Sequence, residues 1–133
     1  MFPHGPIFVF MEKEIQATVK LWSDQIRYQS KNFKTLIGTV TDEQISLFEK
    51  TLTSCLRFKI LKSESWDADQ PEKGATHRIL SVDYQPDQEL STSLRMAGLS
   101  CLLLPLKSQT FTCPGVIIYS FGYSIDRERL EIK

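Results

Sequence analysis

The chain has 133 residues, a length that favours one domain able to bury a hydrophobic core without disulfides or metals. Lys plus Arg and Asp plus Glu both number 16, so no net charge draws the protein to nucleic acid or to an anionic membrane surface. Hydrophobic residues make up 41% and charged residues 24%, proportions that argue against long disorder.

Cysteine usage indicates a reducing compartment. The three cysteines, Cys55, Cys101 and Cys113, are an odd number at irregular spacing, which favours free thiols over a disulfide framework. The apolar run Ile7–Phe10 is too short for the core of a signal peptide, and no apolar stretch reaches the length of a membrane span. We therefore expect a cytoplasmic or nuclear protein, or one found in both compartments.

The first half of the chain predicts two helices. Residues 1–10 contain Pro and Gly and predict an N-terminal extension, whereas residues 11–133 predict a single domain. A helix is expected over Met11 to Gln29, where apolar residues recur at helical spacing. These residues are Ile15, Val19, Trp22 and Ile26.

The second helix has a clear start signal. Thr41 and Gln44 match a capping box, in which each side chain satisfies a free backbone amide of the first turn. The apolar stripe that follows predicts a helix from Asp42 to Ile60. Two amphipathic helices joined by a loop of about a dozen residues suggest a helical hairpin that needs a further layer to cover its apolar faces.

The second half supplies that layer. The segment His77–Val82 has the composition of a strand, and Pro86-Asp87 opens a short helix that stops at Gly98. That helix places Leu90, Leu94 and Ala97 on one face.

Two further β-rich runs, Gln109–Cys113 and Val116–Ser120, flank Pro114-Gly115 and are expected to pair antiparallel through a type II turn. Leu130–Ile132 is expected to add an edge strand. The predicted fold class is α+β: an amphipathic helical hairpin and short helices packed on a small, mainly antiparallel sheet.

Two spaced patterns carry most of the functional information. They are Trp66-x4-Pro71-x-Lys73-Gly74-x2-His77-Arg78 and Leu104-Pro105-x8-Pro114-x4-Tyr119-x2-Gly122. Their order and spacing resemble the two boxes of the BTG/Tob antiproliferative family. His77 stands where the family has a tyrosine, Phe111 where it has a tryptophan, and Cys113 where it has an aspartate. The start, Met11-x-x-Glu14-Ile15, is similar to the family's first helix, and the resemblance runs from Met11 to Tyr123.

The resemblance implies a non-enzymatic adaptor, with no cofactor and no metal. Its partner would be the Caf-type catalytic subunit of the cytoplasmic deadenylase complex, so the protein would promote mRNA poly(A) shortening, translational repression and antiproliferative control. An RNA-binding protein could be a further partner, whereas direct nucleic-acid or membrane binding is not expected. The residues expected to contact a partner are Trp66, His77, Arg78, Phe111, Cys113, Pro114 and Tyr119.

Other interpretations remain open. Trp66 could pack in the core, and Arg78 could be a structural donor that ties loop carbonyls. Because Phe111 and Cys113 depart from the family, the domain could instead be a self-associating or RNA-regulatory scaffold that has lost the deadenylase contact, with the Ile7–Phe10 segment meeting a neighbouring chain.

A small thiol hydrolase is a third possibility, because Cys113 and His77 both lie in the boxes. A catalytic thiol needs a lowered pKa and an oriented base, and neither follows from the sequence. The scattered cysteines form no Cys-x2-Cys pair, so a structural zinc site is not expected.

Overall fold

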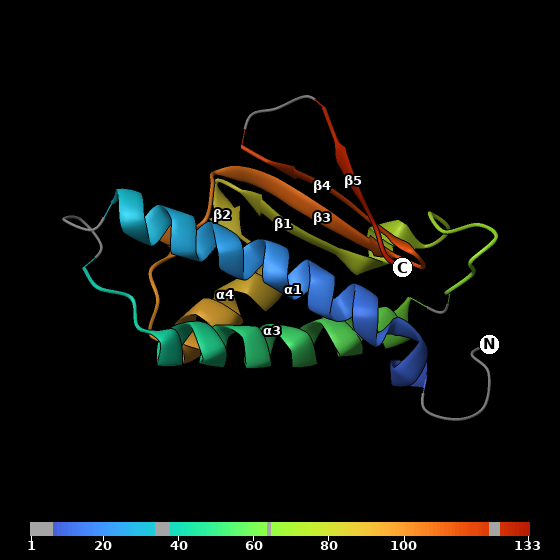
Figure 1. Ribbon diagram of the computed structural model, residues 1–133, viewed down its shortest axis with the longest axis horizontal. Coiled ribbons are helices and arrows are strands. Elements are labelled where there is room, and N and C mark those ends of the chain that lie inside the picture. Colours follow the sequence, from blue (N-terminus) through green and yellow to red (C-terminus); the bar gives the residue numbers. More distant parts are fainter. Residues whose placement is uncertain (1–6, 34–37, 64, 123–125) are drawn as a thin grey trace.

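The computed structural model describes residues 7–33, 38–63, 65–122 and 126–133. A long helix and a short helix cover one face of an antiparallel sheet, and a second long helix packs against both of them on the side away from the sheet (Figure 1). The helical elements are α1 (Ile7–Asn32), α3 (Asp42–Lys62), α4 (Gln88–Met96) and two 3-10 turns, η1 (Ala75–Arg78) and η2 (Cys101–Leu103). The strands are β1 (Ile79–Asp83), β2 (Gln85–Pro86), β3 (Lys107–Cys113), β4 (Val116–Phe121) and β5 (Glu128–Glu131). The expected α+β class is confirmed.

The sheet has the strand order β2-β1-β3-β4-β5, and all neighbouring strands are antiparallel. The hairpin between β3 and β4 forms as predicted, with Cys113 opposite Val116 across the Pro114-Gly115 turn. Gly115 has φ of 77°, a left-handed conformation that glycine adopts at little cost. The last strand, β5, is an edge strand, but it begins at Glu128 instead of Leu130.

The first helix is longer than expected. It begins at Ile7 and ends at Asn32, whereas the apolar periodicity predicted Met11 to Gln29. Residues 7–10 are therefore its first turn, and a helical segment cannot add to a sheet edge as a strand. The predicted core face is confirmed, because Ile15, Val19, Trp22 and Ile26 are each at most 2% exposed.

The capping box predicted for the second helix is present. The Thr41 hydroxyl accepts from the Gln44 amide at 3.1 Å, and the Gln44 side chain accepts from the Thr41 amide at 3.0 Å. The helix starts at Asp42 as predicted and continues two residues beyond Ile60, to Lys62. Its apolar stripe packs against α1 and α4 and completes the core.

The expected strand over His77–Val82 is partly wrong. His77 and Arg78 belong to η1, and β1 begins at Ile79. The 3-10 turn forms because Gly74, with φ of 76°, turns the backbone just before it, and Arg78 then points inward from its end. The short helix α4 forms with Asp87 as its N-cap, and its three predicted core residues are buried.

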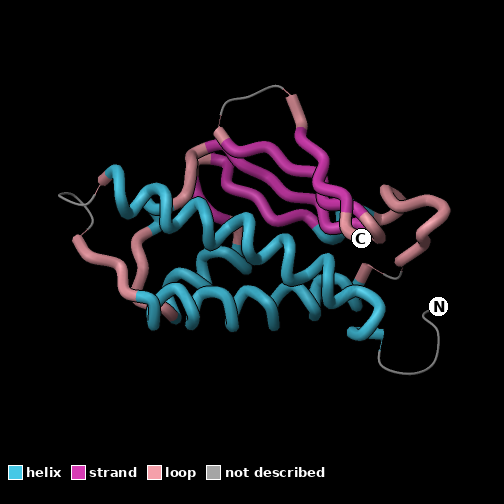
Figure 2. The backbone as a smooth tube through the Cα atoms, viewed as in Figure 1, coloured by secondary structure: helices cyan, strands magenta, loops and turns pink. Residues whose placement is uncertain are grey.

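The two layers are joined by buried polar contacts as well as apolar packing. The Trp22 indole N–H donates to the Thr110 hydroxyl at 2.9 Å, and the Thr18 and Thr112 hydroxyls share a hydrogen bond of 2.8 Å. Phe121 stands edge-on to Trp22, with ring centroids 5.0 Å apart. These contacts fix one face of β3 and β4 against α1, so the other face points away from the helices (Figure 2).

We predict that Thr110→Val lowers the free energy of unfolding by about 1–3 kcal/mol, because it leaves the buried Trp22 N–H without its acceptor. Urea unfolding followed by tryptophan fluorescence measures this change.

Thr112→Val is the matched control, since it makes the same change two residues along the same face of β3. It should cost less, because the Thr18 hydroxyl still donates to the Glu14 carbonyl at 3.0 Å. Equal costs for the two variants would contradict a specific role for the bond from Trp22.

Candidate partner-binding site

A buried arginine organises the first box. The Arg78 side chain has no exposed surface, and its guanidinium donates to four backbone carbonyl oxygens. These are the carbonyls of Thr112 (2.6 Å), Ser65 (2.7 Å), Lys73 (3.1 Å) and Pro71 (3.2 Å). One side chain thereby ties the loop of the first box to the end of β3.

The chemistry of arginine explains why this residue type is needed. A guanidinium carries five N–H donors in a flat fork, so it can serve acceptors that approach from several directions. Burial lowers the pKa of Arg78 from its ordinary value, and the hydrogen bond with the Cys113 sulfur raises it back in part. The carbonyl oxygens compensate the charge that water would otherwise solvate.

Gly74 is required by the same packing. A Cβ atom at this position would lie 3.0 Å from the Ser65 Cβ and 3.2 Å from an Arg78 guanidinium nitrogen. Because φ is also positive here, a side chain at this position would strain the backbone and require Ser65 or Arg78 to shift. The Lys-Gly pair of the first box therefore has a structural cause.

Trp66 is held between this loop and the core. It is half-buried and packs against the main hydrophobic cluster. The guanidinium carbon of Arg78 lies 5.3 Å from the centroid of a Trp66 ring, within the range of a cation–π contact. Both interpretations of Trp66 thus have a basis in the structure, since part of its surface is in the core and part faces solvent.

A second, smaller apolar cluster lies on the face of the sheet that points away from the helices. Its buried members are Ala75, Cys113, Val116 and Ile118, and Phe111 packs against them half-buried. The guanidinium carbon of Arg127 lies 5.1 Å from the Phe111 ring centroid. Phe111 therefore offers an aromatic surface on the outer face, next to the loop that Arg78 holds.

Cys113 and His77 do not make a catalytic pair. Burial raises the pKa of the Cys113 thiol, and the Arg78 hydrogen bond offsets only part of this effect. The thiol is fully buried, whereas His77 is exposed. A nucleophilic cysteine needs the reverse, a lowered pKa and access to solvent.

The remaining predicted residues lie at different depths. Pro114 is buried in the hairpin turn, where Glu14 accepts from the following Gly115 amide at 3.0 Å. Tyr119 shares the helix-facing side of β4 with Phe121, and their ring centroids are 5.7 Å apart. Burial and then the neighbouring Glu128 raise the pKa of Tyr119. Tyr119 therefore points to the opposite face of the sheet from Phe111.

The structure thus brings Trp66, Arg78, Cys113 and Phe111 together through direct contacts, with His77 exposed on η1 beside them. Arg78 and Cys113 are fully buried and could affect a partner only by positioning their neighbours. Sequence reasoning missed Ile118, which alternation along β4 places beside Phe111. It also missed Arg127, for which the sequence carried no signal.

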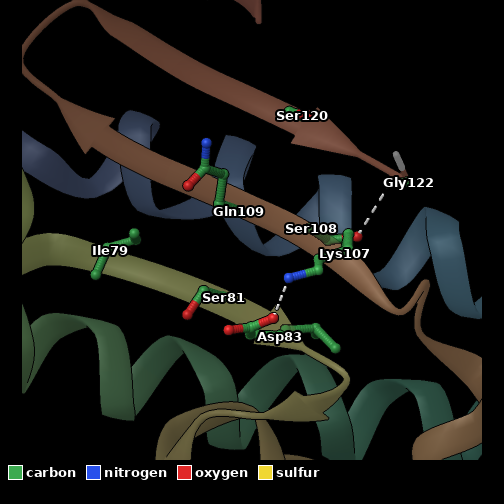
Figure 3. Close-up of a pocket in the computed structure, with 9 residues that line it drawn as sticks. Ile79, Ser81, Asp83, Lys107, Ser108, Gln109, Ser120 and Gly122 are labelled. Atoms are coloured by element: carbon green, nitrogen blue, oxygen red, sulfur yellow. Dashed lines mark hydrogen bonds and ion pairs between the residues drawn. The ribbon is translucent and has the colours of Figure 1, made fainter. Parts of the chain in front are cut away.

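Next to this cluster, the outer face of β1, β3 and β4 forms an open, polar groove of about 460 Å³ (Figure 3). Ser81, Gln109 and Ser120 lie across its floor, and Lys107 forms an ion pair with Asp83 at one end. Phe111 therefore stands at the apolar end of an outer face whose other end is polar.

Within the described ranges, no helix is long and apolar enough to cross a membrane. The same part of the chain brings together no group of three His, Cys, Asp or Glu side chains suited to hold a metal ion.

We predict that Arg78→Lys lowers the free energy of unfolding by about 3 kcal/mol or more. An ammonium group donates from a single point and cannot reach four carbonyls, so buried acceptors lose their partners. Urea unfolding measures the loss. Arg95→Lys, at an exposed position of α4, should change stability by less than about 0.5 kcal/mol, and equal effects at the two positions would contradict the assigned role.

The three cysteines should react in a fixed order with an electrophilic probe. Exposed Cys101 should be alkylated first and half-buried Cys55 next, whereas Cys113 should react only after unfolding. Peptide mass spectrometry over a time course at neutral pH measures the three rates. Labelling of Cys113 as fast as Cys101 would revive the thiol-enzyme hypothesis.

Comparison with known proteins identifies the family and the fold. The sequence model that describes the BTG family matches residues 11–127 of this chain. Among solved structures, the fold is similar to the BTG/Tob domain of C. elegans FOG-3, in a doubly substituted form, with a TM-score of 0.66 and 18% sequence identity. The match covers 90% of this chain and 81% of that one. A search of curated proteins found no match. The chain therefore belongs to the BTG family, whose members are generally non-enzymatic antiproliferative adaptors built on a protein-interaction domain.

Proposed function

We propose that this domain is an adaptor that binds a Caf-type catalytic subunit of the cytoplasmic deadenylase complex. By recruiting that enzyme it would promote shortening of mRNA poly(A) tails, and so repress translation and proliferation. It would act in the cytoplasm, the nucleus or both, and it would contribute a surface and no catalytic group. Family membership supports the adaptor role, and the outer face of the sheet supports the place of contact.

The observation that carries the proposal is the half-buried position of Phe111. Its ring rests on the buried side chains of Ala75, Val116 and Ile118, so its conformation is fixed before any partner arrives. A rigid aromatic on an apolar base, surrounded by polar groups, is the usual form of an interface anchor. The exposed His77 and Arg127 provide such polar groups nearby.

Arg78 supports the same surface from inside. Its bonds to the carbonyls of Ser65, Pro71 and Lys73 order the loop that carries Trp66. An ordered loop loses less conformational entropy on binding than a loose one. The ordered loop then holds Trp66 in a fixed position, while Phe111 supplies the fixed aromatic of the outer face.

Cys113 weakens the contact that the family resemblance implies. The family has an aspartate at this position, whereas the cysteine here is fully buried and offers the partner no carboxylate. The affinity must then rest on the apolar anchor and its polar surroundings. This burial also favours the alternative that the domain is a self-associating or RNA-regulatory scaffold that has lost the deadenylase contact.

The decisive experiment is a binding titration of the purified chain with a purified Caf-type deadenylase, by calorimetry or biolayer interferometry. Phe111→Ala should weaken binding by about tenfold or more, because it removes the aromatic anchor from the interface centre. Phe111→Trp should bind at least as tightly as the parent chain, since it restores the family's residue.

Leu47→Ala is the matched control, because Leu47 is 48% exposed on α3, away from the sheet's outer face. It should leave the affinity unchanged. Absence of binding by the parent chain would remove the deadenylase proposal and leave the scaffold alternative. Equal losses for the Phe111 and Leu47 variants would show that the contact lies elsewhere.

A further inference from the structure

The strand β5 ends the sheet with an open edge. No other described strand lies beyond it in the strand order, and all four of its residues are exposed. In Figure 2 it is the outermost strand on its side of the sheet. The opposite edge strand, β2, is only two residues long and includes Pro86, so it offers little to pair with.

The backbone of β5 presents hydrogen-bonding groups on this edge at defined positions. The Ile132 amide donates to the Gly115 carbonyl at 2.9 Å. Because antiparallel bonding alternates, Leu130 also directs its N–H and C=O toward β4. Arg129 and Glu131 lie between these residues and direct their N–H and C=O groups outward.

The side chains of β5 are complementary to themselves. We propose that two copies of this chain associate by antiparallel pairing of their β5 strands, about a two-fold axis that passes through Leu130. In this register, Arg129 of each copy lies opposite Glu131 of the other. Both residues direct their backbone groups outward, so the two strands can exchange hydrogen bonds in the pattern of a continuous sheet.

Charge selects this register over its neighbours. A shift by one residue would pair outward-facing backbone groups with inward-facing ones, which cannot form a ladder. If the axis passed through residue 129, the Arg129 side chains of the two copies would lie opposite each other, and if it passed through residue 131, the two Glu131 side chains would. Like charges directly opposite are destabilising. The proposed register instead sets Leu130, 37% exposed, against Leu130 of the second copy.

Net charge also permits the association. Basic and acidic residues balance at 16 each, so two copies do not repel at long range. The pairing covers less surface than a stable dimer needs, and we expect a weak complex with a dissociation constant of about 10 μM or more. Neither Phe111 nor Trp66 takes part in this pairing, so its test is independent of the deadenylase proposal. The pairing also gives the scaffold alternative a specific surface.

The test exchanges charged residues on β5. Sedimentation equilibrium over a concentration series of the full chain then measures self-association. Arg129→Glu and Glu131→Arg should each weaken self-association by about tenfold or more, because each sets like charges opposite in the dimer. An equimolar mixture of the two variants should associate as well as the parent chain. In the mixed dimer, the acidic side chains at positions 129 and 131 of one variant lie opposite the basic side chains at positions 131 and 129 of the other.

The mixture separates pairing between copies from effects within one chain. The contact between Arg129 and Glu131 of the same chain, 3.8 Å long, is lost in both variants and is not restored by mixing. A mixture of Arg95→Glu and Glu72→Arg, both at exposed positions outside β5, carries the same net charges and should associate no better than its components.

Two results would overturn the proposal. One is a parent chain that stays monomeric at all concentrations, and the other is a β5 mixture that associates no better than its separate variants. Thermal unfolding should show that both variants remain folded, because an exposed ion pair contributes little to stability.

Discussion

A single buried charge, the guanidinium of Arg78, fixes how the two boxes of this domain meet. It lies inside the protein with no exposed surface, and its acceptors are backbone carbonyls from both boxes. A charge in this position is tolerated only while its hydrogen bonds are complete, so the loop from Ser65 to Lys73 must take one conformation. Gly74 leaves the space for that conformation, and Trp66 covers it from outside.

The division of the sheet into two faces follows from the packing of α1. Threonines on β3 accept or share hydrogen bonds with Trp22 and Thr18, so one face is committed to the helices. The other face is left to Phe111 and its apolar support at one end and to the polar groove at the other. The fold and the proposed binding surface therefore depend on opposite faces of the same strand, β3.

Much of the fold could be predicted from the sequence, because its signals are local. The apolar spacing of α1, the Thr41–Gln44 capping box and the Pro114-Gly115 turn each depend on neighbouring residues, and each is present in the structure. The helix ends were less well predicted, since terminal turns depend on the packing around them.

The site was harder to predict, because its causes are not local. His77 and Arg78 have the composition of a strand start, yet they form a 3-10 turn, since the inward position of Arg78 depends on carbonyls as distant in sequence as that of Thr112. For the same reason, the depth of Cys113 and the position of Arg127 over Phe111 could not be inferred. The chain of contacts from Trp66 through Arg78 and Cys113 to Phe111 joins residues that are far apart in the sequence, so local signals gave no indication of it.

Amide hydrogen exchange in the parent chain and in Arg78→Lys tests most directly whether this guanidinium orders the first box. The amides of Gln70, Lys73 and Ala75 form turn hydrogen bonds of 3.1, 3.0 and 3.1 Å within the loop that Arg78 holds. In Arg78→Lys, the factor by which their exchange rates rise should be about ten times the factor for amides in the middle of α1, because the loop opens locally. Exchange at these three amides that is unchanged, or that accelerates only as much as in α1, would contradict the central role given to Arg78.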